Sequence, residues 1–417
     1  MVFVILIISN WVVASGVQGK SIYPVHYNVI LLPEKDLAKV KISIEKSHLV
    51  KSITFRLDPD VFSHLEANGE LTIKNNRAKW TLPKKNAELT LEAKLTHERD
   101  PGEFDALVTK DWAIFRGDDL IPPASVKAKK GAQSQAYLSF ELPQHWPSVN
   151  TGWQRDEKAP LKDNQTLPPH FIIDDPERKF DRPTGWMIAG KVGTRASFLG
   201  KTRIDISAPM GESFHRMDAL AFINIVWPHA KAAFSEENNI EFFGPDKLLI
   251  LGAGDPMWRG GLSASNSFFM HADRPLVSEN GTSTLVHELV HMLTRIKAKG
   301  NADWIVEGIA EFYAVELLYR AGAYGKDRRD IVYSKLKKWG KEAKTLNVKR
   351  SSGPVTAKAV VLLDKVDQEI RKKTDNQFSL DHVTRKLIEK RKITVDDLKK
   401  ACHELVGEPC ASLNNIP

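Results

Sequence analysis

The residues with the clearest chemical meaning lie in the segment Thr284–Leu293, which contains the pattern H-E-x-x-H. On an α-helix, residues i and i+4 lie on one face, so His287 and His291 can hold one metal ion between them. Imidazole nitrogens suit zinc, and Glu288 stands beside them as a candidate general base for a water molecule that the metal activates. The pattern therefore predicts a hydrolytic zinc site, although a core helix with two hydrogen-bonded histidines would show the same five letters.

A second helical segment, Trp304–Tyr313, can supply the third protein ligand that a catalytic zinc ion requires. Its Glu307 lies between Ile305 and Ile309, where an unpaired carboxylate would be costly. Glu311, one turn later on the same face, is expected either to accept a hydrogen bond from a ligand histidine or to be a solvated charge. We predict one zinc ion per chain with three ligands, His287, His291 and Glu307.

The two motifs together, H-E-x-x-H and W-x-x-E-G-x-A-E-F, resemble those of zinc metallopeptidases whose third metal ligand is glutamate, the gluzincins. The sequence is most similar to the glycyl aminopeptidase family, relatives of the membrane alanyl aminopeptidases. Gly260–Ser267 resembles that family's cleft-lining segment G-G-L-E-H-R-N-S, and Leu363–Asp381 resembles its L-D, I-R, T and S-L-D pattern. The resemblance implies peptide hydrolysis in a thermolysin-like domain, with substrate bound by Gly260, Gly261, Leu262, Ser263 and Asn266.

The sequence departs from the family pattern at two positions. Ser263 stands where the family's aminopeptidases have the glutamate that grips the free amine of the substrate. Thr356 stands where the family has the tyrosine that stabilises the oxyanion, and loss of such a donor typically costs roughly 10² to 10³ in rate. Other side chains are candidates for the two roles: Tyr319, Tyr324, Tyr333, His271 and His382 for the oxyanion donor, and Asp273 and Glu279 for the missing carboxylate.

Residues 2–16 form an apolar run that ends in small residues, as in a signal peptide. The run lacks a preceding Lys or Arg and is short against the about 20 residues that a membrane anchor needs. We expect a signal peptide over residues 1–19 and export to the periplasm or beyond, with an uncleaved anchor as the alternative. An exported chain whose two cysteines lie close together predicts a disulfide between Cys402 and Cys410, whereas a cytosolic chain would keep two free thiols.

The charge balance of the chain is basic, with a net charge of +8 over 417 residues. Such a balance could indicate nucleic acid or an anionic membrane. Aromatic residues do not interleave with the basic runs, which favours a lysine-rich solvated surface instead. We therefore expect a peptide or protein substrate as partner, no nucleic acid, and no membrane span beyond the N-terminal segment.

Residues 20–207 carry a strand-like pattern. Apolar residues alternate with polar ones in short runs such as Val25–Leu31 and Val40–Ile44, and turn residues separate the runs. This pattern predicts an N-terminal β-sandwich domain, interrupted by a long polar loop over residues 143–181.

From Phe214 the apolar period becomes helical. Residues 208–322 are expected to form the catalytic domain, and residues 323–417 a C-terminal helical domain in which Ser379 and Thr394 are candidate N-caps. Two strands are expected before the metal helices, Lys247–Gly252 and Asn266–Ala272. The chain is thus predicted to be α+β and multidomain, with a β-sandwich, a thermolysin-like zinc peptidase domain and a helical domain in that order.

Three classes of function fit these features. The first is an exported zinc metallopeptidase. The second is a catalytically weak or silent zinc-binding homologue that binds peptides or a partner protein. The third is a basic surface-binding protein in which zinc is only structural. The complete set of ligands and the adjacent base favour the first class.

Overall fold

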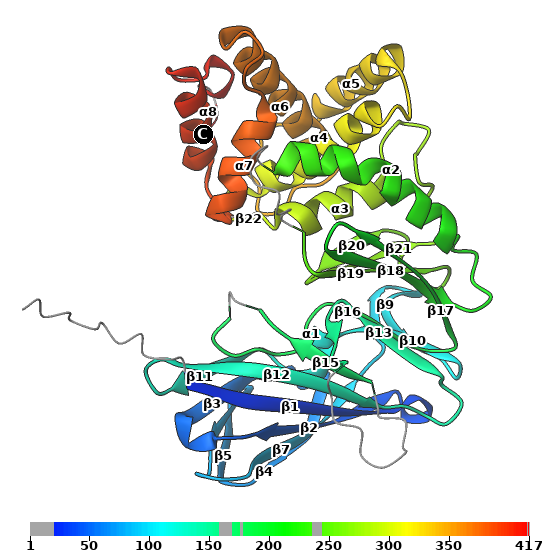
Figure 1. Ribbon diagram of the computed structural model, residues 1–417, viewed down its shortest axis with the longest axis vertical. Helices are drawn as coiled ribbons and strands as arrows, with labels where there is room; N and C mark the ends of the chain where they lie inside the picture. The colour runs from blue at the N-terminus through cyan, green and yellow to red at the C-terminus, as the bar shows by residue number, and fades with distance from the viewer. Residues whose placement is uncertain (1–20, 158–168, 176–177, 236–243, 415, 417) are drawn as a thin grey trace, which may run out of the picture.

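The structure is a computed structural model that describes residues 21–157, 169–175, 178–235, 244–414 and 416 (Figure 1). The expected signal peptide over residues 1–19 lies outside these residues. Strands make up nearly all of the regular structure up to Pro209, and helices dominate after it. The fold is mixed α/β, with several sheets and eight helices among the described residues.

Two sheets at the N-terminal end enclose one hydrophobic core. Alternate residues of β1 are buried, as its apolar pattern predicts, and they meet Ile53 and Trp80 of the opposite sheet. The larger sheet has the order β14 (Gln154–Arg155), β15 (His170–Ile173), β12 (Ala132–Glu141), β1 (Ser21–Leu32), β2 (Leu37–Ile44), β7 (Ala87–Lys94), β4 (Phe62–Ala67). The smaller sheet has the order β11 (Ala124–Ala128), β3 (Val50–Arg56), β6 (Arg77–Thr81), β5 (Glu70–Lys74).

A third sheet lies between this core and the part of the chain that carries the metal motifs (Figure 1). Its order is β13 (Ser148–Thr151), β16 (Trp186–Gly190), β10 (Trp112–Arg116), β9 (Glu103–Val108), β8 (His97–Asp100), and the short helix α1 (Gly117–Leu120) follows β10. Residues 143–181 were expected to be one long loop, and this expectation is wrong because β13, β14 and β15 lie within them. These strands are too short for their alternation to stand out from the proline-rich sequence around them.

A fourth sheet supports the helices that carry the two predicted metal motifs. Its order is β17 (Val192–Leu199), β18 (Thr202–Pro209), β19 (Lys247–Ala253), β21 (Ser267–His271), β20 (Gly261–Ala264). Leu248 and Ile250 pack on the helices, whereas Leu249 and Leu251 pack on Trp186 of the third sheet. The domain boundary expected between residues 207 and 208 falls inside β18. The fourth sheet begins before that boundary, at Val192 of β17.

The helices pack as one cluster on this sheet: α2 (Arg216–Phe234), α3 (Thr284–Thr294), α4 (Asp303–Arg320), α5 (Lys326–Gly340), α6 (Pro354–Lys373), α7 (Leu380–Lys390) and α8 (Val395–Val406). The short strands β22 (Lys297–Ala298) and β23 (Lys392–Ile393) pair beside them. Gly308 explains how closely α4 and α6 approach, because a Cβ at this position would lie 2.8 Å from the Cβ of Ala359. A glycine inside a helix costs about 1 kcal/mol relative to alanine, and this close approach accounts for it.

The capping and disulfide predictions agree with the structure. Ser379 and Thr394 cap α7 and α8, each in a reciprocal capping box. Cys402 and Cys410 form a disulfide with their Cα atoms 6.2 Å apart. Among the described residues, none of the helices combines the length and apolar character needed to cross a membrane.

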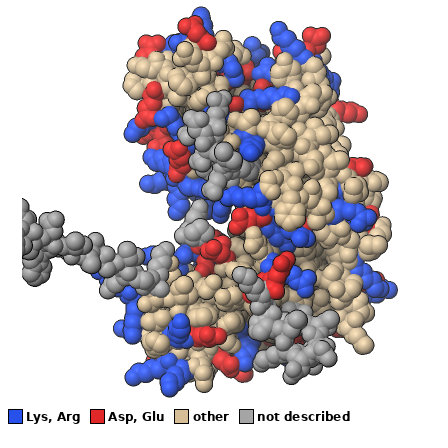
Figure 2. All heavy atoms as spheres, in the orientation of Figure 1, with Lys and Arg blue, Asp and Glu red and all other residues tan. Residues whose placement is uncertain are grey.

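Charged side chains are mixed over the visible face of the molecule. Figure 2 shows lysine and arginine scattered among aspartate and glutamate there, with other residues between them. On this face, side chains of both charges are therefore interspersed.

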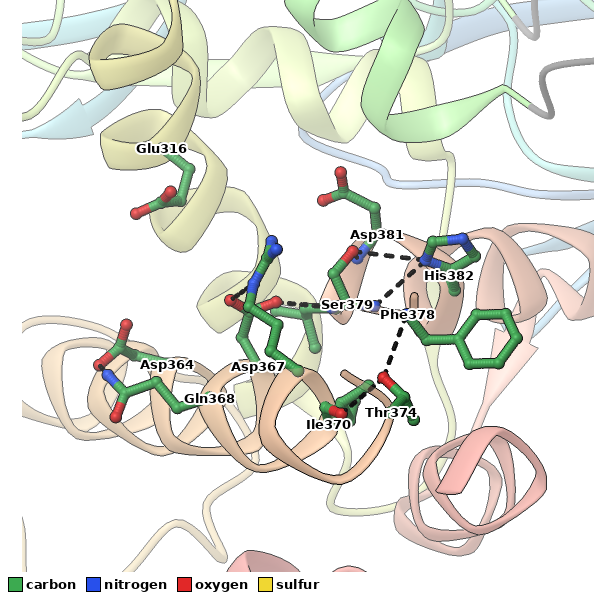
Figure 3. A network of polar contacts seen from close by, with 12 residues as sticks. Glu316, Asp364, Asp367, Gln368, Ile370, Thr374, Phe378, Ser379, Asp381 and His382 are labelled. Carbon is green, nitrogen blue, oxygen red and sulfur yellow. Dashed lines mark hydrogen bonds and ion pairs between the residues drawn. The ribbon is translucent and has the colours of Figure 1, made fainter. Parts of the chain in front are cut away.

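Polar contacts anchor α4 against α5 and α7, and a further network joins α6 to the start of α7 (Figure 3). Arg320 of α4 donates to both carboxylate oxygens of Asp381, at 2.8 and 3.0 Å, and the hydroxyl of Tyr313 donates to the same carboxylate at 2.9 Å. Glu316 accepts hydrogen bonds from Arg329 and Tyr333 of α5, at 2.7 and 2.9 Å. The backbone N–H of Leu380 donates to Asp367 at 2.7 Å, which joins α6 to the start of α7.

We predict that Asp381→Asn destabilises the protein by about 2 kcal/mol, because Arg320 and Tyr313 would lose a charged acceptor in a largely buried position. Unfolding in urea, followed by circular dichroism, measures the change. Asp330→Asn is the matched control, since the Asp330 side chain is 58% exposed and lies 4.0 Å from Arg329. The control should change stability by less than about 0.5 kcal/mol; equal effects of the two substitutions would contradict the anchoring role.

Candidate metal centre

Helix α3 presents the H-E-x-x-H motif as the sequence predicts. The hydroxyl of Ser283 caps the helix by accepting a hydrogen bond from the N–H of Val286 at 3.2 Å. The apolar face of α3 is fully buried against the fourth sheet and the neighbouring helices: Leu285, Val286, Leu289, Val290 and Leu293. Burial of this face fixes the rotation of the helix, so His287 and His291 both turn toward α4.

Helix α4 brings Glu307 to these two histidines. The Nε2 atoms of His287 and His291 lie 3.1 Å apart. The Glu307 carboxylate oxygens lie 3.4 Å from Nε2 of His287 and 3.6 Å from Nε2 of His291. Tetrahedral ligands about 2.1 Å from one zinc ion would lie about 3.4 Å from each other. The donor atoms present therefore fit a single zinc ion in both chemistry and spacing.

Glu311 completes the arrangement from the next turn of α4. Its carboxylate lies 2.8 Å from Nδ1 of His287, and its side chain is 19% exposed. This contact places the ring proton of His287 on Nδ1 and leaves Nε2 available as a ligand. Of the two expectations for Glu311, the structure shows the contact with a histidine rather than a solvated charge.

The two carboxylates and two imidazoles shift one another's proton affinity. Burial disfavours the charged form of His287, but hydrogen bonds to Glu307 and Glu311 outweigh it and raise the pKa of His287 to about 10. Burial acts to raise the pKa of Glu307, yet the two imidazoles hold that pKa well below its ordinary value. The metal-free site therefore carries a proton at neutral pH, and a metal ion has to displace this proton when it binds.

Glu288 lies on the side of α3 that faces β20. It is 7% exposed, and a Cβ added to Gly261 would lie 3.2 Å from its Oε1 atom and 2.6 Å from Cγ2 of Thr284. Gly261 is therefore required for the close approach of the strand to the helix. β20 forms the edge of the fourth sheet and, among the described strands, pairs only with β21.

The fold itself can be compared with known proteins. No protein-family sequence model matches the chain, and no curated protein matches it. Among solved structures, the fold is similar to the crystal structure of an aminopeptidase N family protein from Idiomarina loihiensis, with a TM-score of 0.62 over 88% of this chain and 70% of that chain. The chain thus has a fold similar to that of this aminopeptidase N family protein. The sequence identity is 15%, so the likeness concerns the fold alone.

Within this aminopeptidase N fold, a cleft of about 420 Å³ lies beside the candidate ligands. His291 and Glu307 line it, together with Ser263 and Asn266 of the predicted substrate-binding segment. Four further charged residues line the same cleft: Asp175, Arg178, Arg295 and Lys297. The sequence did not single out these four, because no motif links them to the metal helices and only the tertiary structure brings them there.

The candidates for an oxyanion donor lie elsewhere in the aminopeptidase N fold. None of the five lines the cleft. Tyr324 donates to two backbone carbonyls, Tyr333 donates to Glu316, and His382 belongs to the cap of α7. His271 is buried 3.4 Å from Asp255, and Tyr319 is partly exposed beside Arg329.

Neither near-sequence candidate for the missing carboxylate reaches Ser263. Asp273 lies beyond the far end of β21, near Arg259 and His271, and Glu279 is exposed. Thr356 lies in the first turn of α6, one turn before the Ala359 that packs on Gly308. The segment in which the resemblance implies a tyrosine as oxyanion donor thus lies close to α4, but this chain has a threonine at that position.

We predict that Gly261→Ala destabilises the protein by about 1 to 3 kcal/mol, because the new methyl group would overlap Thr284. Combining it with Thr284→Ser, which removes the obstructing methyl group, should recover part of this loss in a double-mutant cycle of urea unfolding. Gly325→Ala is the matched control, since no atom lies within 4 Å of a Cβ at that position. Additive effects of the two substitutions would show that β20 does not press on α3 at this point.

Proposed function

We propose that this chain is an exported zinc metallopeptidase that hydrolyses peptide bonds. One observation carries the proposal: Nε2 of His287, Nε2 of His291 and the carboxylate of Glu307 converge beside the buried carboxylate of Glu288. The aminopeptidase N fold around this group supports a peptidase-like role. The disulfide and the apolar N-terminal segment support export.

The residues divide the chemistry among them. A bound zinc ion would polarise the scissile carbonyl and make the attacking water more acidic. Glu288 accepts the proton of that water on its carboxylate and returns it to the leaving amine. Glu311 holds His287 in the tautomer that directs Nε2 to the metal. The free edge of β20 can pair with the backbone of an extended peptide and orient it beside Glu288.

A second function is favoured by a specific observation: none of the candidate oxyanion donors lines the cleft, and Thr356 lacks the acidic hydroxyl of tyrosine. The chain would then be a zinc protein that binds peptides and cuts them slowly or not at all. Loss of one oxyanion donor typically lowers the rate by roughly 10² to 10³, so both functions predict peptide binding and differ in turnover.

We expect purified protein to hold one zinc ion per chain through His287, His291 and Glu307. Metal analysis after dialysis should find no zinc in the double variant His287→Ala, His291→Ala. Glu311→Gln should weaken zinc affinity by about 10- to 100-fold, because it removes the charged acceptor of the His287 ring proton. His64→Ala, at a histidine with a 75% exposed side chain, is the control and should retain zinc. Stoichiometric zinc in the double variant would contradict the ligand assignment.

We expect a library of short peptides to be hydrolysed, and Glu288→Gln to lower kcat by at least about 10²-fold because the general base is lost.

Acetylated and free peptides of one sequence should be cut with kcat/KM values within about threefold of each other. Ser263 offers no charge to an amine, and Asp175, which lines the cleft, is paired with Arg178. Cleavage restricted to free N-termini would overturn the specificity, and no cleavage by the zinc-loaded protein would favour the second function.

A further inference from the structure

Cationic side chains gather at the end of the cleft where the resemblance would place a glutamate. Arg178, Arg295 and Lys297 line the cleft beside Ser263. The described carboxylates that line it are Glu307, which faces the two histidines, and Asp175, which pairs with Arg178 at 3.0 Å. Among the described residues that line the cleft, Arg178 and Arg295 are thus the guanidinium groups closest to the predicted substrate-binding segment.

Arg295 contributes a guanidinium with no ion pair or side-chain hydrogen bond among the described residues. It follows α3 directly and adopts the left-handed conformation, with φ 51°, that normally favours glycine after a helix. Its side chain lies at the cleft beside His291 and Met292. A donor fork with five N–H groups thus stands at the cleft, with its hydrogen-bonding capacity open to a ligand.

Arg178 contributes a second donor from the N-terminal half of the chain. Its Nε atom donates to Asp175, which fixes the guanidinium. Its Nη1 atom is buried and has no hydrogen-bond partner among the described residues. The side chain as a whole is 30% exposed and lines the cleft, so its exposed N–H groups can donate to a carboxylate of a bound ligand.

The position of the cleft along β20 indicates which part of a bound peptide Arg178 and Arg295 would meet. Gly261 lies beside Glu288, whereas Ser263 and Ala264 lie at the cleft. Ser263 lies two residues from Gly261, about 7 Å along the strand, so a peptide paired with β20 would present a side chain about two residues from the scissile bond to the cations.

We infer that the cleft selects peptides with a carboxylate within about two residues of the scissile bond, bound by Arg178 and Arg295. This inference rests on the proposed function and names the substrate class of the same site. The carboxylate can belong to an aspartate or glutamate side chain or to the C-terminus of the peptide.

Peptide binding to the zinc-loaded Glu288→Gln protein tests the inference without requiring turnover. Fluorescence anisotropy would compare three labelled peptides: one with glutamate and an amidated C-terminus, one with glutamine and an amidated C-terminus, and one with glutamine and a free C-terminus. We expect the glutamate peptide to bind about tenfold more tightly than the amidated glutamine peptide, as for one charge-assisted hydrogen bond. Tighter binding of the free C-terminus instead would assign the carboxylate to the peptide end.

Two variants separate the binding role from folding. Arg295→Gly suits the left-handed conformation of that residue, so the fold should persist while the preference for the anionic peptide falls to about threefold or less. Arg178→Gln should lower the preference in the same way. Arg195→Gln removes a positive charge from an exposed position on β17 and should keep the tenfold ratio.

The outcomes distinguish this inference from the proposed function. Equal affinity for all three peptides, or a preference that survives both cleft variants, overturns the inference whether or not the wild-type protein cuts peptides. A preference lost in both variants supports it. Failure of the wild-type protein to hydrolyse the glutamate peptide counts against the peptidase and leaves the binding result valid.

Discussion

Two half-buried carboxylates packed against two imidazoles, between α3 and α4, form the constraint on which the rest of the structure depends. Glu307 and Glu311 project from a helix that is otherwise mostly apolar, where an uncompensated negative charge would be costly. His287 and His291 compensate it only if the two helices keep their spacing and rotation. The apolar contacts of α3 with the fourth sheet and the helix cluster hold that geometry.

Contacts with α5, α6 and α7 hold helix α4 on its other sides. Gly308 lets α6 approach within contact distance, and the carboxylates of Glu316 and Asp381 tie α4 to α5 and α7. The glycine of the second motif is thus a packing residue beside the candidate ligand Glu307. Residues remote from the ligands therefore set the position of Glu307 by fixing the helix that carries it.

The sequence predicted those parts of the site whose geometry is local. A spacing of four residues on a helix is enough to bring His287 and His291 together, and apolar neighbours mark Glu307 as exceptional. Arg178 gave no such signal, because it follows short strands in a polar stretch and reaches the cleft only through tertiary packing. The start of the fourth sheet at Val192 could not be predicted for a similar reason, because strands of two successive sheets show the same alternation. Only the pairing of β18 with β19 assigns β17 and β18 to the fourth sheet.

The contact of Trp186 with the edge of the fourth sheet has a consequence for how this protein can evolve. Its backbone N–H donates to Ser267 and its indole N–H donates to the carbonyl of Leu262, both at 2.7 Å, so the N-terminal half holds the strand that borders Glu288. That half also supplies Arg178 to the cleft, whereas the candidate metal ligands come from α3 and α4. Mutations in the N-terminal half can therefore reshape the cleft while the candidate ligands on α3 and α4 stay unchanged.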